Sequence, residues 1–261
     1  MTSYKNYYEL LIYTLKQNNI SIKFDDFDCF EAIEGRKNGK VFSNEEHLRG
    51  IIFSLLSSQR PWGPILQNKK NICEIFHNFD LDYIANTDPS LFEDSIRSIK
   101  CGNKSIHRQM SSLPQIVAKL KDISNQFSSA DMFVNSDKPI IIAKKMSTNG
   151  KFKIPELGLA LALEYLRNVG INVAKPDTQL CRLFGRDRLG LSSKTPAKPE
   201  EVVEIIDNIA TETNMSPAKL GTMFWLICAK DYGHICSSNT PSCLLCMFQS
   251  VCNYYREKVY I

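Results

Sequence analysis

The sequence contains no apolar run long enough to cross a bilayer, and its first residues, 1–6, lack the charged-then-apolar layout of a secretory signal. Stretches that alternate between apolar and polar residues, as strands do, are scarce, and there is no internal repeat or low-complexity tract. The charge excess is small, +4 over 261 residues, so a polyanionic partner is permitted but not demanded. We therefore expect a folded protein of the cytoplasm, without a membrane-spanning segment.

Along most of the chain, apolar residues recur at helical spacing. The length suits one large domain or two modest ones. A capping box at residues 43–46 precedes an apolar helical face that ends at Leu56. Helices are also expected from Pro199 and from the Ser216-Pro217 pair. The pattern predicts an all-α protein, with residues 122–153 as a long, partly ordered connection in which the run 140–142 alone resembles a strand.

Nine cysteines are present, and an odd number in a long chain without export signals argues against a disulfide framework. Five of them show no shared spacing and fit a buried core: Cys29, Cys73, Cys101, Cys181 and Cys228. The remaining four read C-x6-C-x2-C-x5-C: Cys236, Cys243, Cys246 and Cys252. Four thiolates suit zinc or an iron–sulfur cluster. Structural zinc sites usually pair two short knuckles, and only one is present, so the spacing favours the wider cluster.

A second motif lies at Ile154–Gly158, where a proline and a glycine precede a helix of alternating small residues. Such a turn predicts a helix-hairpin-helix, which offers backbone N–H groups and a helix N-terminus to a DNA phosphate. A plain helical hairpin would give the same local pattern. Nineteen residues beyond Gly158 comes Asp177, at the start of another apolar-periodic helix. Aspartate is a common N-cap, and the positive end of the helix dipole favours its ionised form.

In this order, hairpin, aspartate and cysteine loop resemble the endonuclease III-like helix-hairpin-helix DNA glycosylases. The segment Leu55–Gln59 resembles the L-S-x-Q helix end of that superfamily, whose glutamine helps to fill the gap left by an extruded base. The resemblance spans residues 40–254. It implies two helical domains, a barrel at 40–172 and a cluster domain of 1–39 plus 173–261. It also implies a [4Fe–4S] cluster on the four spaced cysteines, and DNA contacts at Gln59, Leu157, Gly158 and Ala160.

The resemblance further implies that Asp177 is catalytic. When a glycosidic bond breaks, the sugar gains oxocarbenium character, which a carboxylate stabilises while it orients or deprotonates a water. Members that also cut the strand carry a lysine where this chain has Ala160, so we expect a monofunctional glycosylase. We expect it to be a monomer and to act on double-stranded DNA that contains a damaged or modified base. Nearby lysines at 151, 153 and 175 are candidates for residual lyase activity. The alternatives are a non-catalytic DNA-binding relative and a zinc-stabilised interaction module.

Some positions depart from the superfamily pattern. Glu156 stands where the hairpin usually has glycine, and Phe53 stands where the adenine-excising branch has glutamate. Trp62 follows the glutamine region and either stacks on an extruded base or packs between helices; with Phe53 it forms the predicted base pocket. The loop 237–242 carries no basic residue, so phosphate contacts are expected from Lys104, Lys144, Lys145, Lys151, Lys153, Arg182 and Arg186.

Overall fold

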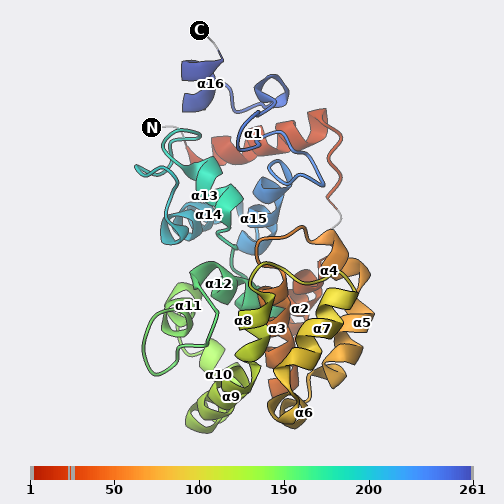
Figure 1. Cartoon of the computed structure of the whole chain (residues 1–261). Coiled ribbons are helices and arrows are strands. Elements are labelled where there is room, and N and C mark those ends of the chain that lie inside the picture. Colours follow the sequence, from red (N-terminus) through yellow and green to blue (C-terminus); the bar gives the residue numbers. More distant parts are fainter. Residues whose placement is uncertain (1–2, 23, 25–26, 260–261) are drawn as a thin grey trace. The chain divides into compact units, whose positions relative to one another are not determined.

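The computed structural model describes residues 3–22, 24 and 27–259, and within this part of the chain every regular element is a helix (Figure 1). The predicted all-α fold is confirmed. The chain forms two compact units, the first from Met1–Phe30 with Asn172–Ile261 and the second from Glu31–Ile171. No helix in the described ranges combines the length and apolar character that crossing a bilayer requires.

The first unit is built around packed helices from both ends of the sequence. Its elements are α1 (Tyr4–Gln17), α13 (Thr178–Phe184), α14 (Pro199–Thr213), α15 (Pro217–Leu226), the 3-10 helix η3 (Cys243–Leu245) and α16 (Asn253–Lys258). α14 packs on α1, α13 and α15. Leu11, Phe184, Ile206 and Phe224 are buried together in its core, so the N-terminal helix completes a unit that is otherwise C-terminal.

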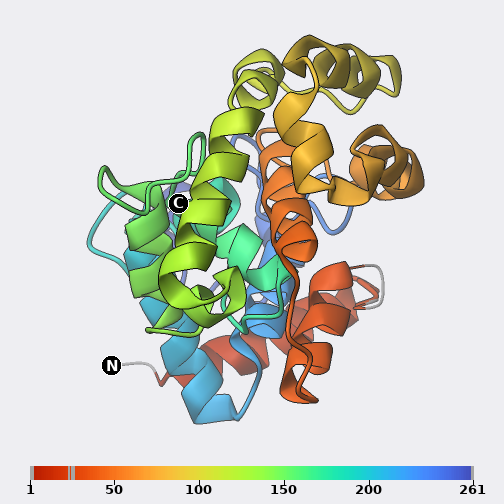
Figure 2. The same ribbon diagram turned by 90° about the horizontal axis from the view of Figure 1, so that it is seen from below.

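The second unit surrounds α3 (Asn44–Leu56), which is buried from His47 onward except at the half-buried Arg49. The other helices are α2 (Asp28–Lys37), which begins in the first unit, α4 (Gly63–Gln67), α5 (Lys69–Ile75), η2 (His77–Phe79), α6 (Leu81–Asn86), α7 (Pro89–Ser98), α8 (Ile106–Ser111), α9 (Leu113–Phe127), α10 (Ala130–Val134), α11 (Pro139–Ser147) and α12 (Leu159–Asn168). Figure 2 shows α9 beside α3, in agreement with their contacts. The C-terminal part of α3 is apolar on nearly all sides, as expected of a core helix.

Helix starts follow the local sequence signals. Ser43 accepts from the Glu46 amide while the Glu46 carboxylate accepts from the Ser43 amide, which is the predicted capping box. The helices predicted from Pro199 and Ser216 are α14 and α15. These starts were predictable because each depends on residues within one turn.

The predicted connection at 122–153 is wrong, because most of this segment is helical. α9 continues to Phe127, and α10 and α11 follow. Ser129 caps α10 by accepting from the Met132 amide, and Pro139 occupies the first turn of α11. The polar residues that resembled a loop are therefore helix-start signals, and the run 140–142 is helix rather than strand.

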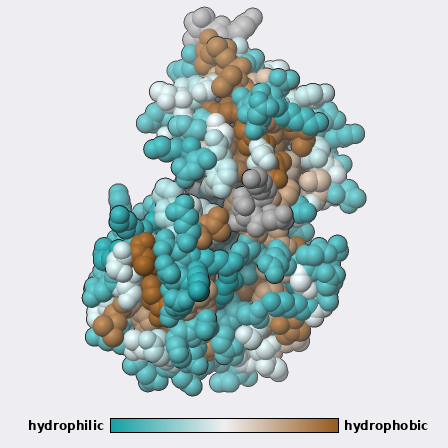
Figure 3. Space-filling view, turned by 90° about the vertical axis from the view of Figure 1, so that its right-hand side faces the viewer, coloured by the Kyte–Doolittle hydropathy of each residue, from teal (hydrophilic) through white to brown (hydrophobic). Residues whose placement is uncertain are grey.

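The first boundary between the units lies at Phe30–Glu31 rather than at residue 39. Arg36 on α2 explains this, because its Nη2 donates to Asp131 Oδ1 at 2.6 Å and to the Val169 carbonyl at 2.7 Å. These bonds tie α2 to the second unit. On the face in Figure 3 the surface is mainly hydrophilic, with apolar residues in small groups.

Candidate functional site

The hairpin between α11 and α12 is fixed from inside by two apolar side chains. Ile154 and Leu157 are fully buried, and the Leu157 amide donates to the Ile154 carbonyl at 3.3 Å. The Ile154 amide donates in turn to the Met146 carbonyl at 3.0 Å, at the end of α11. The turn therefore has one defined conformation, with Gly158 exposed at its outer side and Ala160 half-buried in the first turn of α12.

Gly158 is the N-cap of α12, and no side chain caps this helix. Its φ of −81° suits any residue, and a Cβ built on it would meet no atom within 4 Å. Neither conformation nor packing within the unit requires glycine here. What the glycine provides is an uncovered backbone at a helix N-terminus, where N–H groups and the helix dipole attract an anion.

Two charged groups lie at the same turn. Glu156 has a φ of +61°, in the left-handed region, and its carboxylate accepts from Arg108 Nε on α8 at 2.7 Å. The amine of Lys153 donates to the Leu157 carbonyl. Burial lowers the pKa of Lys153 from its usual range, an effect that the Glu156 charge opposes. Lys153, predicted as a phosphate contact, thus has a partner inside the hairpin.

The segment after α3 carries Gln59, which is exposed and has a φ of +54°. Next to it, Arg60 donates to the carbonyl oxygens of Lys100 at 2.8 Å and Gly102 at 3.1 Å. The last turn of α3 is closed by side chains, since Asn103 and Gln109 both donate to the Leu55 carbonyl. These bonds hold the segment that presents Gln59.

The two residues of the predicted base pocket have different environments. Phe53 is 6% exposed, and the centroid of its ring lies 6.0 Å from that of Phe79. The guanidinium carbon of Arg49 lies 4.9 Å from the Phe53 ring centroid. Trp62 is half-buried, and its indole N–H is buried without a hydrogen-bond partner among the described residues. An unpaired buried donor costs free energy, so it marks a position where a ligand acceptor would be stabilising.

Asp177 belongs to the first unit, where it is the N-cap of α13. Its Oδ1 accepts from the Gln179 amide at 2.9 Å and from the Leu180 amide at 3.0 Å. The side chain is half-buried. Two backbone donors and the helix dipole favour the ionised carboxylate and fix its orientation.

The cysteine loop follows α15 in the same unit. The amides of Ile235 and Cys236 both donate to the Ile227 carbonyl, at 2.8 and 3.0 Å. Arg182 donates to the Cys236 carbonyl at 2.8 Å and Arg188 to the Ser238 carbonyl at 3.1 Å. The later part of the loop is attached to α1, because Thr14 Oγ1 accepts from the Met247 amide at 3.1 Å.

The thiols of this loop influence one another. The pKa of Cys246 is raised to about 12, mainly by burial and in the same direction by the charges of Cys236, Cys252 and Cys243. The pKa of Cys236 is lowered to about 7, first by a hydrogen bond with Cys228 and then, against burial, by the charges of Arg188 and Arg182. The four spaced cysteines therefore lie within electrostatic range of one another, with two guanidinium groups nearby.

The four thiols of this loop match a metal group in donor type but not in a closed geometry. Among residues 3–22, 24 and 27–259, no three histidine, cysteine, aspartate or glutamate side chains are arranged around a common metal-ion position. The donor type fits a thiophilic group, and the adjacent arginines would offset the negative charge of several thiolates. The arrangement is a loose set of four thiols rather than a closed cage for one ion.

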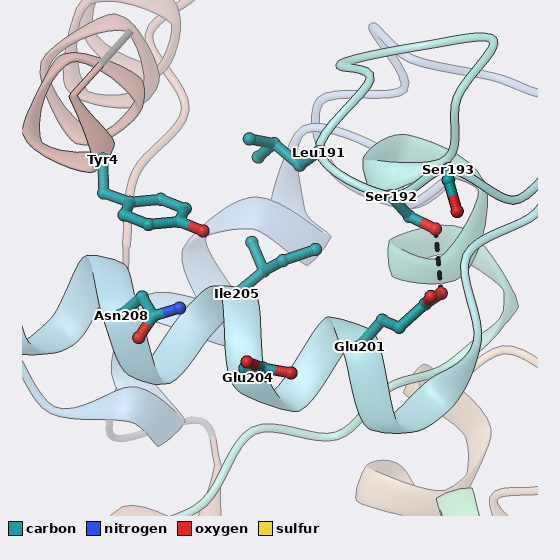
Figure 4. A pocket seen from close by; sticks show the side chains of 8 residues that line it. All are labelled: Tyr4, Leu191, Ser192, Ser193, Glu201, Glu204, Ile205 and Asn208. Carbon is teal, nitrogen blue, oxygen red and sulfur yellow. Dashed lines mark hydrogen bonds between the residues drawn. The ribbon is translucent and has the colours of Figure 1, made fainter. Parts of the chain in front are cut away.

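A separate hollow of about 230 Å³ lies on the first unit (Figure 4). It is lined by Tyr4, Leu191, Ser192, Ser193, Glu201, Glu204, Ile205 and Asn208. Ser192 donates to Glu201 at 2.8 Å across one side of it. None of the residues predicted for the site lines this hollow.

The structure thus assembles the predicted site residues in two groups, one in each unit. Gln59, Trp62 and the hairpin belong to the second unit, and Asp177 with the cysteine loop belongs to the first. Arg108 and Arg188 were not identified from the sequence, and Cys228 was assigned to the buried core without a link to the cysteine loop. Their partners are 48, 50 and 8 residues away in the chain, and no local motif identifies such pairs.

Neither the comparison with protein-family models nor the search of curated protein sequences gives a match. Two solved structures share the fold. One is a Methanocaldococcus jannaschii 8-oxoguanine glycosylase/lyase in complex with a 15mer DNA containing 8-oxoguanine, with a TM-score of 0.56, 18% identity and coverage of 84% of this chain and 96% of that chain. The other is a trapped endonuclease III–DNA covalent intermediate, with a TM-score of 0.61, 14% identity and coverage of 99% of both chains.

These likenesses show that the chain has the endonuclease III fold. The resemblance that the sequence motifs indicated is therefore confirmed at the level of the fold. A fold alone does not determine chemistry, which depends on the residues of the site.

Proposed function

We propose that the chain is a DNA glycosylase that hydrolyses the N-glycosidic bond of a damaged or modified base in double-stranded DNA. The observation that carries the proposal is Asp177, a half-buried carboxylate held by two backbone amides at the N-terminus of α13. It occurs in a fold shared with a DNA glycosylase/lyase and with endonuclease III.

DNA binding is assigned to the second unit. The exposed backbone at Gly158 and the N-terminus of α12 suit a phosphate oxygen, with Leu157 anchoring the turn and Ala160 adding no bulk. Such contacts fix the register of a duplex without reading its sequence. This matches the requirements of a lesion-directed enzyme, which must bind any sequence context.

Base extrusion is assigned to Gln59 and Trp62. Taking a base out of the stack costs a few kcal/mol, and a side chain that fills the gap offsets part of this cost. Gln59 is exposed at the end of the segment held by Arg60 and has the length for that role. Trp62 offers an indole face for stacking and an unpartnered N–H for an acceptor on the base. Phe53 supports this region from the core, behind Arg49.

The chemical step is assigned to Asp177. As the bond between C1′ and the base nitrogen breaks, its electron pair leaves with the base and positive charge develops on the sugar. The ionised carboxylate stabilises that charge and accepts a proton from the water whose oxygen bonds to C1′. The products are the free base, which takes up a proton, and an abasic site.

Water rather than an amine is the proposed nucleophile. Position 160 is alanine, so the first turn of α12 offers no Schiff-base lysine, and the Lys153 amine is bonded to the Leu157 carbonyl. A free amine in contact with C1′ is required for a covalent imine. We therefore assign the chain a monofunctional reaction, without strand cleavage.

We assign a [4Fe–4S] cluster to Cys236, Cys243, Cys246 and Cys252. Four cysteine thiolates are a complete ligand set for this cluster. Arg182 and Arg188 hold the loop through its carbonyls and offset thiolate charge. When bound, the cluster supplies a cross-link between distant parts of the loop, and no step of the hydrolysis uses it.

The test is base release from duplexes that carry single alkylated, deaminated or oxidised bases, with and without alkaline treatment. We expect free base and an abasic strand that is cut only after alkali, and no DNA adduct after borohydride treatment. Asp177→Asn keeps an N-cap but removes the charge, so it should slow base release by about a hundredfold or more while DNA binding persists.

Asp88→Asn is the matched control, because Asp88 also caps a helix through its carboxylate, on α7 in the second unit. It should excise at the rate of the unaltered protein. Base release by Asp177→Asn at the control rate would refute the assigned mechanism.

A non-catalytic DNA-binding protein is the second candidate, favoured by the Glu156 carboxylate at the hairpin. It predicts affinity for distorted duplexes without release of any base. Release from one member of the panel would eliminate it.

A further inference from the structure

The hairpin turn carries a carboxylate at a backbone position that favours glycine. Glu156 has a φ of +61°, in the left-handed region where a Cβ is disfavoured. Its side chain is only 18% exposed, so the carboxylate is held against the protein rather than extended into solvent. A residue kept in an unfavourable conformation requires compensating contacts.

Arg108 supplies the compensating charge from another helix. Its Nε lies 2.7 Å from Glu156 Oε2, across 48 residues of sequence. The Arg108 side chain is 72% exposed, so most of its guanidinium faces solvent although one N–H is engaged. Arginine has five donors in a planar fork, and a phosphate accepts two of them in parallel.

The neighbouring charged groups have hydrogen-bond partners of their own, although the Glu156 charge also acts on the Lys153 amine. Glu93, next to α8, accepts from Arg97 and lies 2.8 Å from His107 Nδ1. Lys153, on the hairpin itself, is bonded to the Leu157 carbonyl. Among the described contacts, Arg108 is therefore the exposed cation that faces Glu156, and an anion arriving at the turn meets both.

We propose that Arg108 and Glu156 form an exchangeable ion pair that controls phosphate binding at the hairpin. A DNA phosphate draws Arg108 away from Glu156, which makes Arg108 a phosphate-contact residue. Glu156 orients Arg108 in the free protein and opposes DNA binding by its negative charge. This inference rests on the proposed function, because it needs the hairpin to meet DNA.

The exchange has a quantitative consequence. Removing Arg108 costs one phosphate contact, but the variant no longer has to break an ion pair with Glu156 when DNA binds. Removing the Glu156 charge lowers the repulsion and frees Arg108 for the phosphate. The two substitutions must therefore be non-additive, and Arg108→Ala must cost more once Glu156 is neutral.

The experiment measures Kd by fluorescence anisotropy for a duplex that contains a tetrahydrofuran abasic analogue, over a series of salt concentrations. The proteins are the unaltered chain, Arg108→Ala, Glu156→Gln, Glu156→Gly and the double variant Arg108→Ala/Glu156→Gln. Glu156→Gln removes the negative charge but keeps a side chain at the unfavourable positive φ. Glu156→Gly removes both the charge and this conformational strain, so comparing the two variants separates the two effects.

We expect Arg108→Ala to weaken binding several-fold and to reduce the slope of log Kd against log salt by about 1. Glu156→Gln should strengthen binding, and Arg108→Ala should cost more in that background. Lys121→Ala is the matched control, because Lys121 also forms an exposed ion pair between helices, with Asp82 at 2.6 Å. It should leave Kd and the slope unchanged.

The outcomes distinguish failure of the ion-pair exchange from failure of the proposed function. If the unaltered protein binds the duplex but Arg108→Ala behaves like Lys121→Ala, or if the two substitutions are additive, the ion-pair exchange is wrong and the proposed function stands. If the unaltered protein binds no duplex, the proposed function fails and this inference fails with it. Melting curves for every variant identify any loss of folding.

Discussion

The Nδ1 atom of His47, on α3, lies 2.6 Å from the hydroxyl oxygen of Tyr165, on α12, and both side chains are buried. The other ring nitrogen of His47 lies 3.3 Å from Asp131 Oδ1, and Asp131 also accepts from both terminal nitrogens of Arg36. One polar network therefore connects four helices of the second unit. Because α12 begins at the hairpin, this network also fixes the helix that presents Gly158.

Asp131→Asn should destabilise the second unit strongly. The side chains of Arg36 and Asp131 are 15% and 8% exposed, so the substitution leaves a buried guanidinium without its counter-charge. Breaking a buried pair by removing one partner costs about 3 kcal/mol or more. Chemical denaturation measures the loss. Asp82→Asn, which breaks an exposed pair with Lys121, is the control and should leave the midpoint unchanged.

Acid should destabilise the same network in two stages. Burial lowers the pKa of His47 from 6.5, against the attraction of Asp131, so the folded protein keeps the ring neutral while the unfolded chain takes up a proton. Stability is therefore full above 6.5 and declines as the pH falls below that value. Burial alone would raise the pKa of Asp131, but His47 and Arg36 lower it well below 3.8, so its contribution is lost only in stronger acid.

The measurement is the denaturation midpoint as a function of pH. His47→Gln should lower stability at neutral pH but remove the decline just below pH 6.5, because glutamine does not titrate. His107→Gln is the control, since His107 is exposed on α8 and pairs with Glu93. A decline that survives in His47→Gln would show that another group is responsible.

The cysteine loop should carry iron. After anaerobic purification we expect about four irons and four sulfides per chain, and a coloured protein. Cys246→Ser removes one proposed ligand and should release the iron and lower the stability of the first unit. Cys73→Ser is the control, because Cys73 lies on α5 in the second unit and shows no shared spacing. A colourless protein with one zinc per chain would replace the cluster by a structural zinc site.

Features set within one helical turn were predictable from the sequence. The capping box of Ser43 and Glu46 and the N-cap position of Asp177 depend on residues two or three apart, so the pattern alone identified them. Ser129 and Pro139 carry the same kind of helix-start signal. Because these signals were not recognised, the segment 122–153 was wrongly predicted as a connection. There the helices are short, and their apolar periodicity is weak.

Features that depend on tertiary contact were not predictable. The ion pair of Arg108 with Glu156 joins residues 48 apart, and the bond of Arg182 with Cys236 joins residues 54 apart. Arg182 was expected to meet phosphate, yet the fold turns it toward the cysteine loop. Which side chains of a helix meet another element is decided by packing, which a single sequence does not record.

Gly158→Ala should separate binding from folding. The φ of Gly158 is −81° and a Cβ there meets no atom within 4 Å, so alanine fits the turn. The loss of a favourable N-cap residue and the smaller freedom of the unfolded chain oppose each other, so the melting temperature should change little. The added methyl would, however, stand over the amides that we assign to phosphate, and the affinity for the abasic-analogue duplex should fall several-fold.

Gly170→Ala provides the opposite case, because the φ of Gly170 is +80° and a Cβ there would lie 2.4 Å from the Ala32 carbonyl oxygen. This variant should lower the melting temperature, while the protein that remains folded should bind DNA with unchanged affinity. If the proposed DNA contact is right, the two glycines differ in what requires them: the fold requires Gly170, and the ligand requires Gly158. Gly158→Ala that binds DNA like the unaltered chain would show that the uncovered backbone of α12 does not meet phosphate, and DNA binding would then have to be assigned elsewhere.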